Sequence, residues 1–226
     1  MWNEFRQTGR DYSDENEVGQ YDQTHADFRD AEAEGREALQ MLGVPQNGTL
    51  LDLGCGTGTF VSLAAQHCSE VIGADVSEAM LAAARAKVSR LGLGNVRFER
   101  HGFLTYAHHG APLDAVTTTY ALHHLPDYWQ AVALRRIHDM LKTGGRFYLR
   151  DVVIPDSMEL FEPVQAFINE QADAGGEFLR KDAEGHFREE FSTFDWVIEG
   201  ILTRAGFTIL DHRVDSHVIS NYLCQK

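Results

Sequence analysis

Residues Leu50–Phe60, read LLDLGCGTGTF, contain the chemistry-bearing pattern of this chain. An apolar run ends in an acid, Asp52, and three alternating glycines follow at Gly54, Gly56 and Gly58. Glycines between a buried strand and a helix let the backbone turn sharply and leave no Cβ to hold a ligand away. Free N–H groups at a helix start favour an anionic ligand group. The pattern predicts a small-molecule site, and a glycine-rich connection without a ligand is the alternative.

A second acid follows the glycine stretch at the distance that nucleotide sites use. Residues 71–77, VIGADVS, form a short apolar run that ends in Asp75, about 20 residues beyond the first glycine, where a carboxylate can accept bonds from ribose hydroxyls. A dinucleotide fingerprint would need a third glycine where Thr59 stands. The observed Gly-x-Gly-x-Gly spacing instead resembles motif I of the class I S-adenosylmethionine-dependent methyltransferases.

The resemblance implies an S-adenosylmethionine site. It places the methionine part of the cofactor on the glycine stretch, the ribose on Asp75, and the adenine beside Val76 and Met80, although Met80 also fits an ordinary core position. The family usually has an acid after the glycine of the third-strand loop, whereas here Gly102 is followed by Phe103. The cofactor residues that it assigns are Asp52, Gly54, Cys55, Gly56, Gly58, Asp75, Val76, Met80, Gly102, Phe103 and Tyr120, with Tyr21 added from an N-terminal flap.

Three residues are candidates for catalysis. Tyr21 lies about thirty residues before motif I, where relatives place an aromatic ring that can face the sulfonium cation. His123 and His124 are candidates for acceptor contact or for a base near neutral pH. Packing is the alternative for each of the three, and two adjacent histidines rarely point the same way. No other ligand-type residue stands near the histidine pair at metal-binding spacing, so we expect no metal.

Bulk properties limit the classes of partner. The chain has 226 residues and a formal net charge of −14, which argues against a nucleic-acid partner because phosphate binding depends on Lys and Arg. Ten acids and two arginines lie between Asp11 and Glu37, which indicates a solvated face or a cap that repels anions. No apolar run is long enough to cross a membrane, and no signal peptide is evident. Three cysteines without metal spacing fit a reducing cytoplasm, and a homodimer is compatible with the sequence.

Strand and helix patterns alternate along the chain, as in a doubly wound parallel sheet. Strands are expected to end at Asp52 and Asp75 and to span residues 95–99, 114–119, 146–153, 207–214 and 217–224, the last two joined by a turn at 215–216. Helices are expected after Ser77, after Pro126 until Gly144-Gly145, and after a capping box at Ser192 and Asp195. We therefore predict a Rossmann-like α/β fold, with a mostly parallel seven-stranded sheet whose last strand is antiparallel, as the resemblance implies.

We expect a single domain over residues 1–226, with a flap at 1–45 and a helical insertion at 154–190. Loops after strand ends build substrate pockets in such folds, so both segments are predicted to cap the substrate; ordinary packing is the alternative for the insertion. The run Tyr120–Leu125 matches the small-molecule branch of the family, so methyl transfer to a small-molecule acceptor is the predicted function. A catalytically silent S-adenosylmethionine-binding partner or sensor is the main alternative, and an NAD-dependent oxidoreductase is disfavoured by Thr59.

Overall fold

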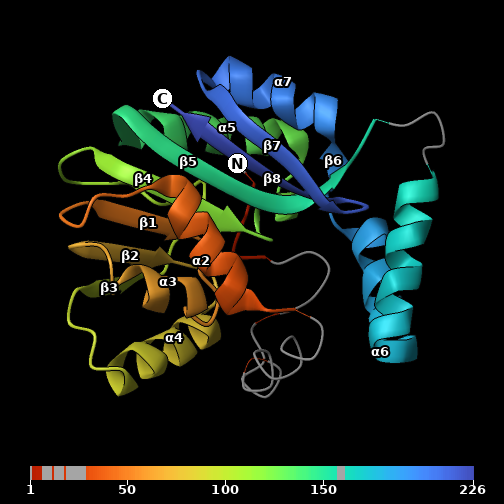
Figure 1. Cartoon of the computed structure of the whole chain (residues 1–226), viewed down its shortest axis with the longest axis horizontal. Coiled ribbons are helices and arrows are strands. Elements are labelled where there is room, and N and C mark those ends of the chain that lie inside the picture. The colour runs from red at the N-terminus through yellow and green to blue at the C-terminus, as the bar shows by residue number, and fades with distance from the viewer. Residues whose placement is uncertain (1, 7–11, 13–17, 19–28, 157–160) are drawn as a thin grey trace.

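The computed structural model describes residues 2–6, 12, 18, 29–156 and 161–226. One sheet runs through this part of the chain in the order β3-β2-β1-β4-β5-β8-β7, and a short strand β6 pairs with β5 (Figure 1). The strands are β1 (Thr49–Leu53), β2 (Glu70–Ala74), β3 (Val96–Glu99), β4 (Leu113–Thr119), β5 (Leu141–Ile154), β6 (Thr193–Phe194), β7 (Thr208–Ser216) and β8 (Ile219–Gln225). This order confirms the predicted α/β fold.

The pairing pattern explains where a ligand can bind. Strands β1 to β5 pair in parallel, so their carboxyl ends lie along one edge of the sheet. The chain reverses its strand order at β1, which pairs with β2 on one side and β4 on the other. Ligands in open parallel sheets bind at such a switch point. The last strand, β8, is antiparallel to both β5 and β7, as predicted.

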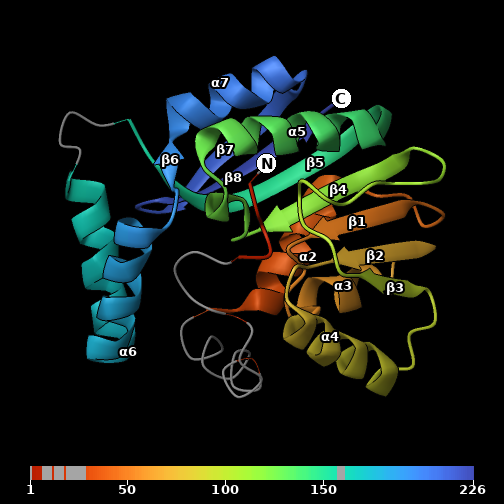
Figure 2. The same ribbon diagram turned by 180° about the vertical axis from the view of Figure 1, so that it is seen from behind.

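Helices cover both faces of the sheet, as Figures 1 and 2 show from opposite sides. The helices are α2 (Ala31–Leu42), α3 (Thr59–Ala64), α4 (Glu78–Arg90), α5 (Asp127–Met140), α6 (Phe161–Glu189) and α7 (Asp195–Ala205), with a 3-10 turn, η1, at Leu122–His124. One core cluster joins the sheet to α5 and α7, and a second joins it to α2, α3 and α4. Burial of these two apolar layers is the main stabilising term of the fold.

Three predicted boundaries were wrong. Helix α5 ends at Met140, and the predicted stop at Gly144-Gly145 lies inside β5. The α7 N-cap is Phe194, because the Ser192 hydroxyl contacts the His186 ring instead of capping the helix.

The closing hairpin turns at His217 and Val218, where His217 has φ of 31°, and the predicted turn residues 215–216 belong to β7. Asp215 stays in the strand, where its carboxylate bonds Arg150.

The predicted insertion is a helical hairpin. The backbone of α6 leaves helical geometry at Gly175 and at Gly176, where φ is 66°, so α6 consists of two helical segments joined by a kink. In both views the hairpin stands away from the sheet beyond the carboxyl end of β5 (Figures 1 and 2). Its inner face packs Val164, Phe167 and Phe187 on a small cluster that β5 and the closing hairpin provide.

Candidate functional site

The three glycines of the β1–α3 loop all have left-handed backbone angles, with φ of 75° at Gly54, 51° at Gly56 and 76° at Gly58. A Cβ at Gly54 would lie 2.4 Å from the Cβ of Ala121, and one at Gly58 would lie 2.9 Å from the Cβ of Ala84. A Cβ at Gly56 meets nothing within 4 Å. Gly54 and Gly58 are therefore needed for close packing, whereas Gly56 leaves open space that a ligand can fill.

Asp75, at the end of β2, is fixed beside this loop. One carboxylate oxygen accepts a 2.8 Å bond from the Gly56 N–H, and the other accepts a 2.8 Å bond from the Ser77 N–H. Ser77 itself caps α4, because its hydroxyl accepts from the Met80 N–H at 3.2 Å. Burial raises the pKa of Asp75, and the two backbone bonds act against that rise. The result is a rigid acceptor group directly beside the open space at Gly56.

Asp52 and Cys55 lie on the other side of the glycine loop. Burial, and then the charge of Asp75, raise the pKa of Asp52 to about 8, so this carboxyl holds a proton at neutral pH. Burial also raises the pKa of the Cys55 thiol well above its usual range. A thiol with a raised pKa is a poor nucleophile, so the Cys55 side chain serves packing here. Its backbone N–H donates to the Ala74 carbonyl, and its own carbonyl accepts from the Gly58 N–H.

A cavity opens at the carboxyl ends of β1, β2 and β4. It is lined by Trp2, Glu4, Arg6, Tyr12, Gly54, Gly56, Asp75, Val76, Met80, His101, Gly102, Phe103, Thr119, Tyr120, Ala121, His124 and Leu125. Nine predicted site residues are therefore gathered in one place. Asp52 and Cys55 line an adjoining cleft that shares Gly54 and Gly56 with the cavity. Gly58 and His123 line neither, and Tyr21 lies outside the described residues.

Glu4 is a cavity residue that the sequence analysis missed. Its buried carboxylate accepts a 2.9 Å bond from the Leu104 N–H and a 2.6 Å bond from the Thr105 hydroxyl. A Cβ on Gly102 would lie 2.5 Å from the same carboxylate. The N-terminal segment thus brings an acid to the loop where an acid was expected after Gly102 and Phe103 stands instead. Only the folded chain reveals this, because Glu4 is far from the loop in sequence.

Tyr120 follows β4 and forms one wall of the cavity. Its φ of 51° is unusual for a residue with a side chain, and such angles persist where the surroundings hold them. The guanidinium group of Arg29 lies 4.3 Å from the centre of the ring, and the Arg150 Nε donates a 3.1 Å bond to the hydroxyl. Burial raises the pKa of Tyr120, so the hydroxyl stays protonated.

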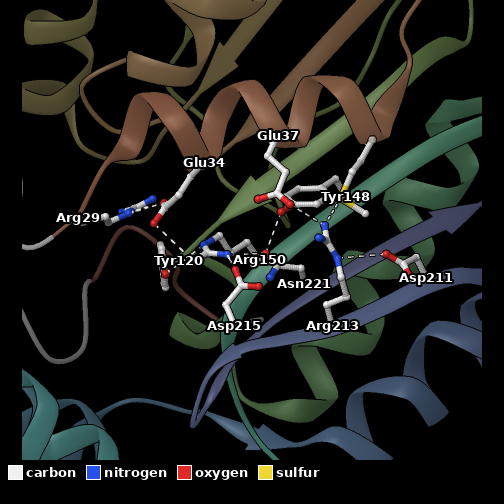
Figure 3. A network of polar contacts seen from close by, with 11 residues as sticks. Arg29, Glu34, Glu37, Tyr120, Tyr148, Arg150, Asp211, Arg213, Asp215 and Asn221 are labelled. Carbon is white, nitrogen blue, oxygen red and sulfur yellow. Dashed lines mark hydrogen bonds and ion pairs between the residues drawn. The ribbon is translucent and has the colours of Figure 1, made fainter.

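Arg150 is the centre of the polar network shown in Figure 3. Besides Tyr120, its guanidinium group bonds Asp215, the Asn221 side chain at 2.7 Å and Glu34 of α2 at 3.3 Å. Glu34 also accepts a bond from Arg29 at 2.5 Å. The network therefore ties the cavity wall to α2 on one side and to the closing hairpin on the other.

Comparison with known proteins agrees with this geometry. A model of a methyltransferase domain matches residues 50–145. An uncharacterized methyltransferase of Anoxybacillus flavithermus is 28% identical over 208 residues, 89% of this chain and 92% of the relative. The demethylmenaquinone methyltransferase of Bacteroides fragilis is 25% identical over 79% of this chain and 75% of its own. These matches, with methyltransferase structures among the neighbours, support a class I S-adenosylmethionine-dependent methyltransferase.

The fold of this methyltransferase is shared by solved structures. A S-adenosylmethionine-dependent methyltransferase from Mesorhizobium loti superimposes with a TM-score of 0.62 at 20% identity, covering 86% of this chain and 98% of that one. S-adenosylmethionine is the cofactor of the family, and the cavity suits it in two respects. Open space at Gly56 leaves room for a ligand against the backbone, and the fixed Asp75 carboxylate can accept from ribose hydroxyls. Among the described residues, no helix is long and apolar enough to cross a membrane.

The two candidate catalytic histidines have different surroundings. His124 faces the cavity, whereas the buried His123 ring lies behind the cavity wall. Burial opposes charge on His123, but the carboxylates of Asp151 and Glu190 outweigh burial and raise the His123 pKa to about 10. Burial and the neighbouring His123 lower the pKa of His124 to about 4, so the ring that faces the cavity is neutral at pH 7.

The sequence analysis expected no metal because no other ligand-type residue lies near the histidine pair along the chain. In the folded structure, two such residues do lie near it. His186, in the last turn of α6, and Glu190, four residues later and just after that helix, lie beside His123. Together the three residues form a group whose ligand atoms all lie within 4.8 Å of one another. A histidine and an acid at i and i+4 near the end of the insertion were the only sequence signal for this group.

Proposed function

We propose that this methyltransferase acts on a small-molecule acceptor that binds in the cavity between the glycine loop and His124. The observation that carries the proposal is the position of the N-terminal segment: Trp2, Glu4, Arg6 and Tyr12 all line the cavity. A cofactor site that is covered by the chain's own residues admits a small acceptor more readily than a polymer. The net charge of −14 likewise disfavours a nucleic acid.

The described residues suggest a role for each part of the cavity. Asp75 would accept from the ribose hydroxyls, and the backbone at Gly54 and Gly56 would hold the methionine part, with Asp52 facing its ammonium group. Met80 and Phe103 would pack on the adenine. When bound, S-adenosylmethionine would supply an activated methyl group: a lone pair of the acceptor would attack the methyl carbon in line with the breaking carbon–sulfur bond, and S-adenosylhomocysteine would leave. The protein must mainly exclude water and align the acceptor, which contributes about 7–11 kcal/mol in well-oriented reactions.

Glu4 bears on the choice between an enzyme and a silent binding protein. A silent member is favoured only by the absence, after Gly102, of the acid that the family usually has there. Glu4 places a carboxylate at the same loop, held by Leu104 and Thr105. We infer that Glu4 takes the position of the missing acid and accepts from the adenine amino group, which removes that support.

His124 is the residue best placed to contact the acceptor. Its ring lines the cavity, and with a pKa of about 4 it is neutral at pH 7. A neutral imidazole can accept a hydrogen bond from the attacking group and so orient its lone pair, although so weak a base retains a proton poorly. The proposed role of Tyr21 at the sulfonium stays a prediction from the sequence.

A screen of metabolite extracts tests the proposal. The purified full chain is incubated with methyl-labelled S-adenosylmethionine and fractionated small molecules, and label in an acceptor is measured together with release of S-adenosylhomocysteine. We expect label in a small molecule with wild-type protein and none with Gly56→Val. Label that enters only protein or nucleic acid, when these are added to the same assay, would contradict a small-molecule acceptor.

A further inference from the structure

A compact group of metal-ligand side chains lies behind the cavity wall. His123 comes from η1, His186 from the last turn of α6, and Glu190 follows that helix. The His123 Nε2 lies 3.2 Å from the Glu190 Oε2, and the His186 Nδ1 contacts the same oxygen. The side chains of His123 and Glu190 are each 7% exposed, so the group is shielded from water.

The remaining ring nitrogens of both histidines are already held by oxygen atoms. The His123 Nδ1 lies 2.5 Å from the Asp151 carboxylate, which also accepts from the His123 backbone N–H at 3.1 Å. The His186 Nε2 lies 2.6 Å from the Ser192 hydroxyl. Each ring is thereby oriented with its other nitrogen toward Glu190. Outer oxygen partners of this kind fix the tautomer and direction of metal-ligating histidines.

We propose that His123, His186 and Glu190 bind a divalent transition-metal ion of the Zn²⁺ type. Two imidazole nitrogens and one carboxylate oxygen suit Zn²⁺ and its neighbours, whereas Mg²⁺ and Ca²⁺ prefer oxygen ligands alone. The separation of 3.2 Å between His123 Nε2 and Glu190 Oε2 is close to the spacing that two ligands on one tetrahedral ion require. The ion would take the place of the direct contacts that His123 and His186 now make with Glu190.

The fourth coordination position would lie toward the cofactor cavity. The His124 Nδ1 is 3.9 Å from the Glu190 Oε1, and it is buried without a hydrogen-bond partner among the described residues. The same ring lines the cavity. Water or the His124 nitrogen would complete the coordination, which places the ion directly behind the wall that faces the methyl acceptor.

The location indicates what a bound ion would do for the fold. Helix α6 stands apart from the sheet (Figures 1 and 2). It contacts the rest of the fold through the apolar side chains of Val164, Phe167 and Phe187, and through Glu170, which contacts Ser216 and His217. A metal shared by His123 and the end of α6 would tie the insertion to η1. This inference does not depend on the identity of the acceptor, and metal binding can be measured without cofactor.

Titration with Zn²⁺ tests the site. Purified full chain is stripped with a chelator, dialysed, and titrated with Zn²⁺ against a chromophoric competitor; Co²⁺ then replaces Zn²⁺ as a spectroscopic probe. We expect one Zn²⁺ per chain and the intense visible absorption of four-coordinate Co²⁺. Glu190→Gln should weaken the stoichiometric binding at least about a hundredfold, and Asp151→Asn about 10–100-fold, as loss of an outer partner does.

A matched pair elsewhere on the surface provides the control. His212 and Glu199 lie 3.3 Å apart, but among the described residues they have no third metal-ligand side chain beside them. Glu199→Gln should therefore leave Zn²⁺ affinity unchanged. Zn²⁺ should also raise the melting temperature of the wild type and of Glu199→Gln, but not that of folded Glu190→Gln. The proposal would be overturned if the wild type did not bind Zn²⁺ stoichiometrically, or if Glu190→Gln and Glu199→Gln lost Zn²⁺ affinity equally. The group would then be a metal-free charge network in which His123 lies between two carboxylates.

Discussion

Neutralising Asp52 should change how cofactor binding depends on pH. Its pKa of about 8 means that the ligand-free protein holds a proton on this buried carboxyl at neutral pH. The methionine ammonium and sulfonium charges would favour the ionised form, so binding should release the proton. If only the ionised form binds, the apparent Kd is multiplied by one plus the ratio of protonated to ionised Asp52. With a pKa of 8, that factor falls about fiftyfold between pH 6 and pH 8 and levels off above.

Calorimetric titration of S-adenosylmethionine into wild-type and Asp52→Asn protein measures this effect. The cofactor's own amino group also titrates, but both proteins meet the same ligand, so their difference isolates Asp52. Wild-type affinity should rise from pH 6 to 8 with proton release that appears as a dependence on buffer ionisation enthalpy. The variant should lack this component. Parallel pH profiles in the two proteins would refute the reasoning.

The raised pKa of Asp52 also predicts how the stability of the ligand-free protein depends on pH. Its folded pKa lies above the unfolded value of 3.8, so between pH 3.8 and 8 the folded state binds more protons than the unfolded state. Stability from Asp52 is therefore fully present below pH 3.8 and is lost as pH rises toward 8, by up to about 1.4 kcal/mol per pH unit. Denaturant unfolding at pH 5 and pH 8 should show that the free energy of unfolding of Asp52→Asn increases relative to that of the wild type as pH rises. An equal difference at both values would contradict the assignment.

Three further substitutions test the cavity. Gly56→Val should abolish cofactor binding with a modest loss of stability, whereas Gly58→Val should mainly unfold the protein, because of these two glycines only Gly58 has a close neighbour. Calorimetric titration and thermal melts distinguish the two outcomes. The reverse pattern would contradict the loop assignment. Asp75→Ala should weaken S-adenosylmethionine binding by about 1.5–3 kcal/mol, and wild-type affinity in a folded variant would remove its ribose role. Glu4→Gln should weaken binding of S-adenosylmethionine more than that of its inosine analogue, which lacks the amino group; equal losses would argue for a role of Glu4 in holding the loop alone.

The parts of the site that could be predicted are those in which sequence neighbours are also neighbours in space. The glycine loop and Asp75 each follow directly from a strand end, so their spacing alone identified the methyltransferase family. Glu4 was not predicted as a site residue because it reaches the Gly102 loop only after the chain has folded. His186 and Glu190 were not predicted for the same reason, because they contact the histidine pair at 123–124 only in the folded chain.

Local rules also failed where a tertiary partner competed for the same side chain. Ser192 has the sequence context of a helix cap, yet its hydroxyl contacts His186 and α7 begins after Phe194. Asp215 has a turn-forming side chain, yet its bond to Arg150 keeps it in β7. In both cases a charged or aromatic side chain from elsewhere in the chain offered a stronger partner than the local backbone, which sequence patterns alone do not reveal.

The strained backbone at Tyr120 connects these tertiary partners to the cavity. A non-glycine residue at φ of 51° costs about 1–3 kcal/mol and persists only where neighbouring groups hold it. Arg150 donates to the Tyr120 hydroxyl, and its other donors are bound by Asp215, Asn221 and Glu34. Because a buried guanidinium group needs all of these partners, the ring of Tyr120 cannot turn without leaving a charge poorly solvated. The closing hairpin and α2 therefore both act on the cavity wall through one arginine, although neither provides a residue that lines the cavity.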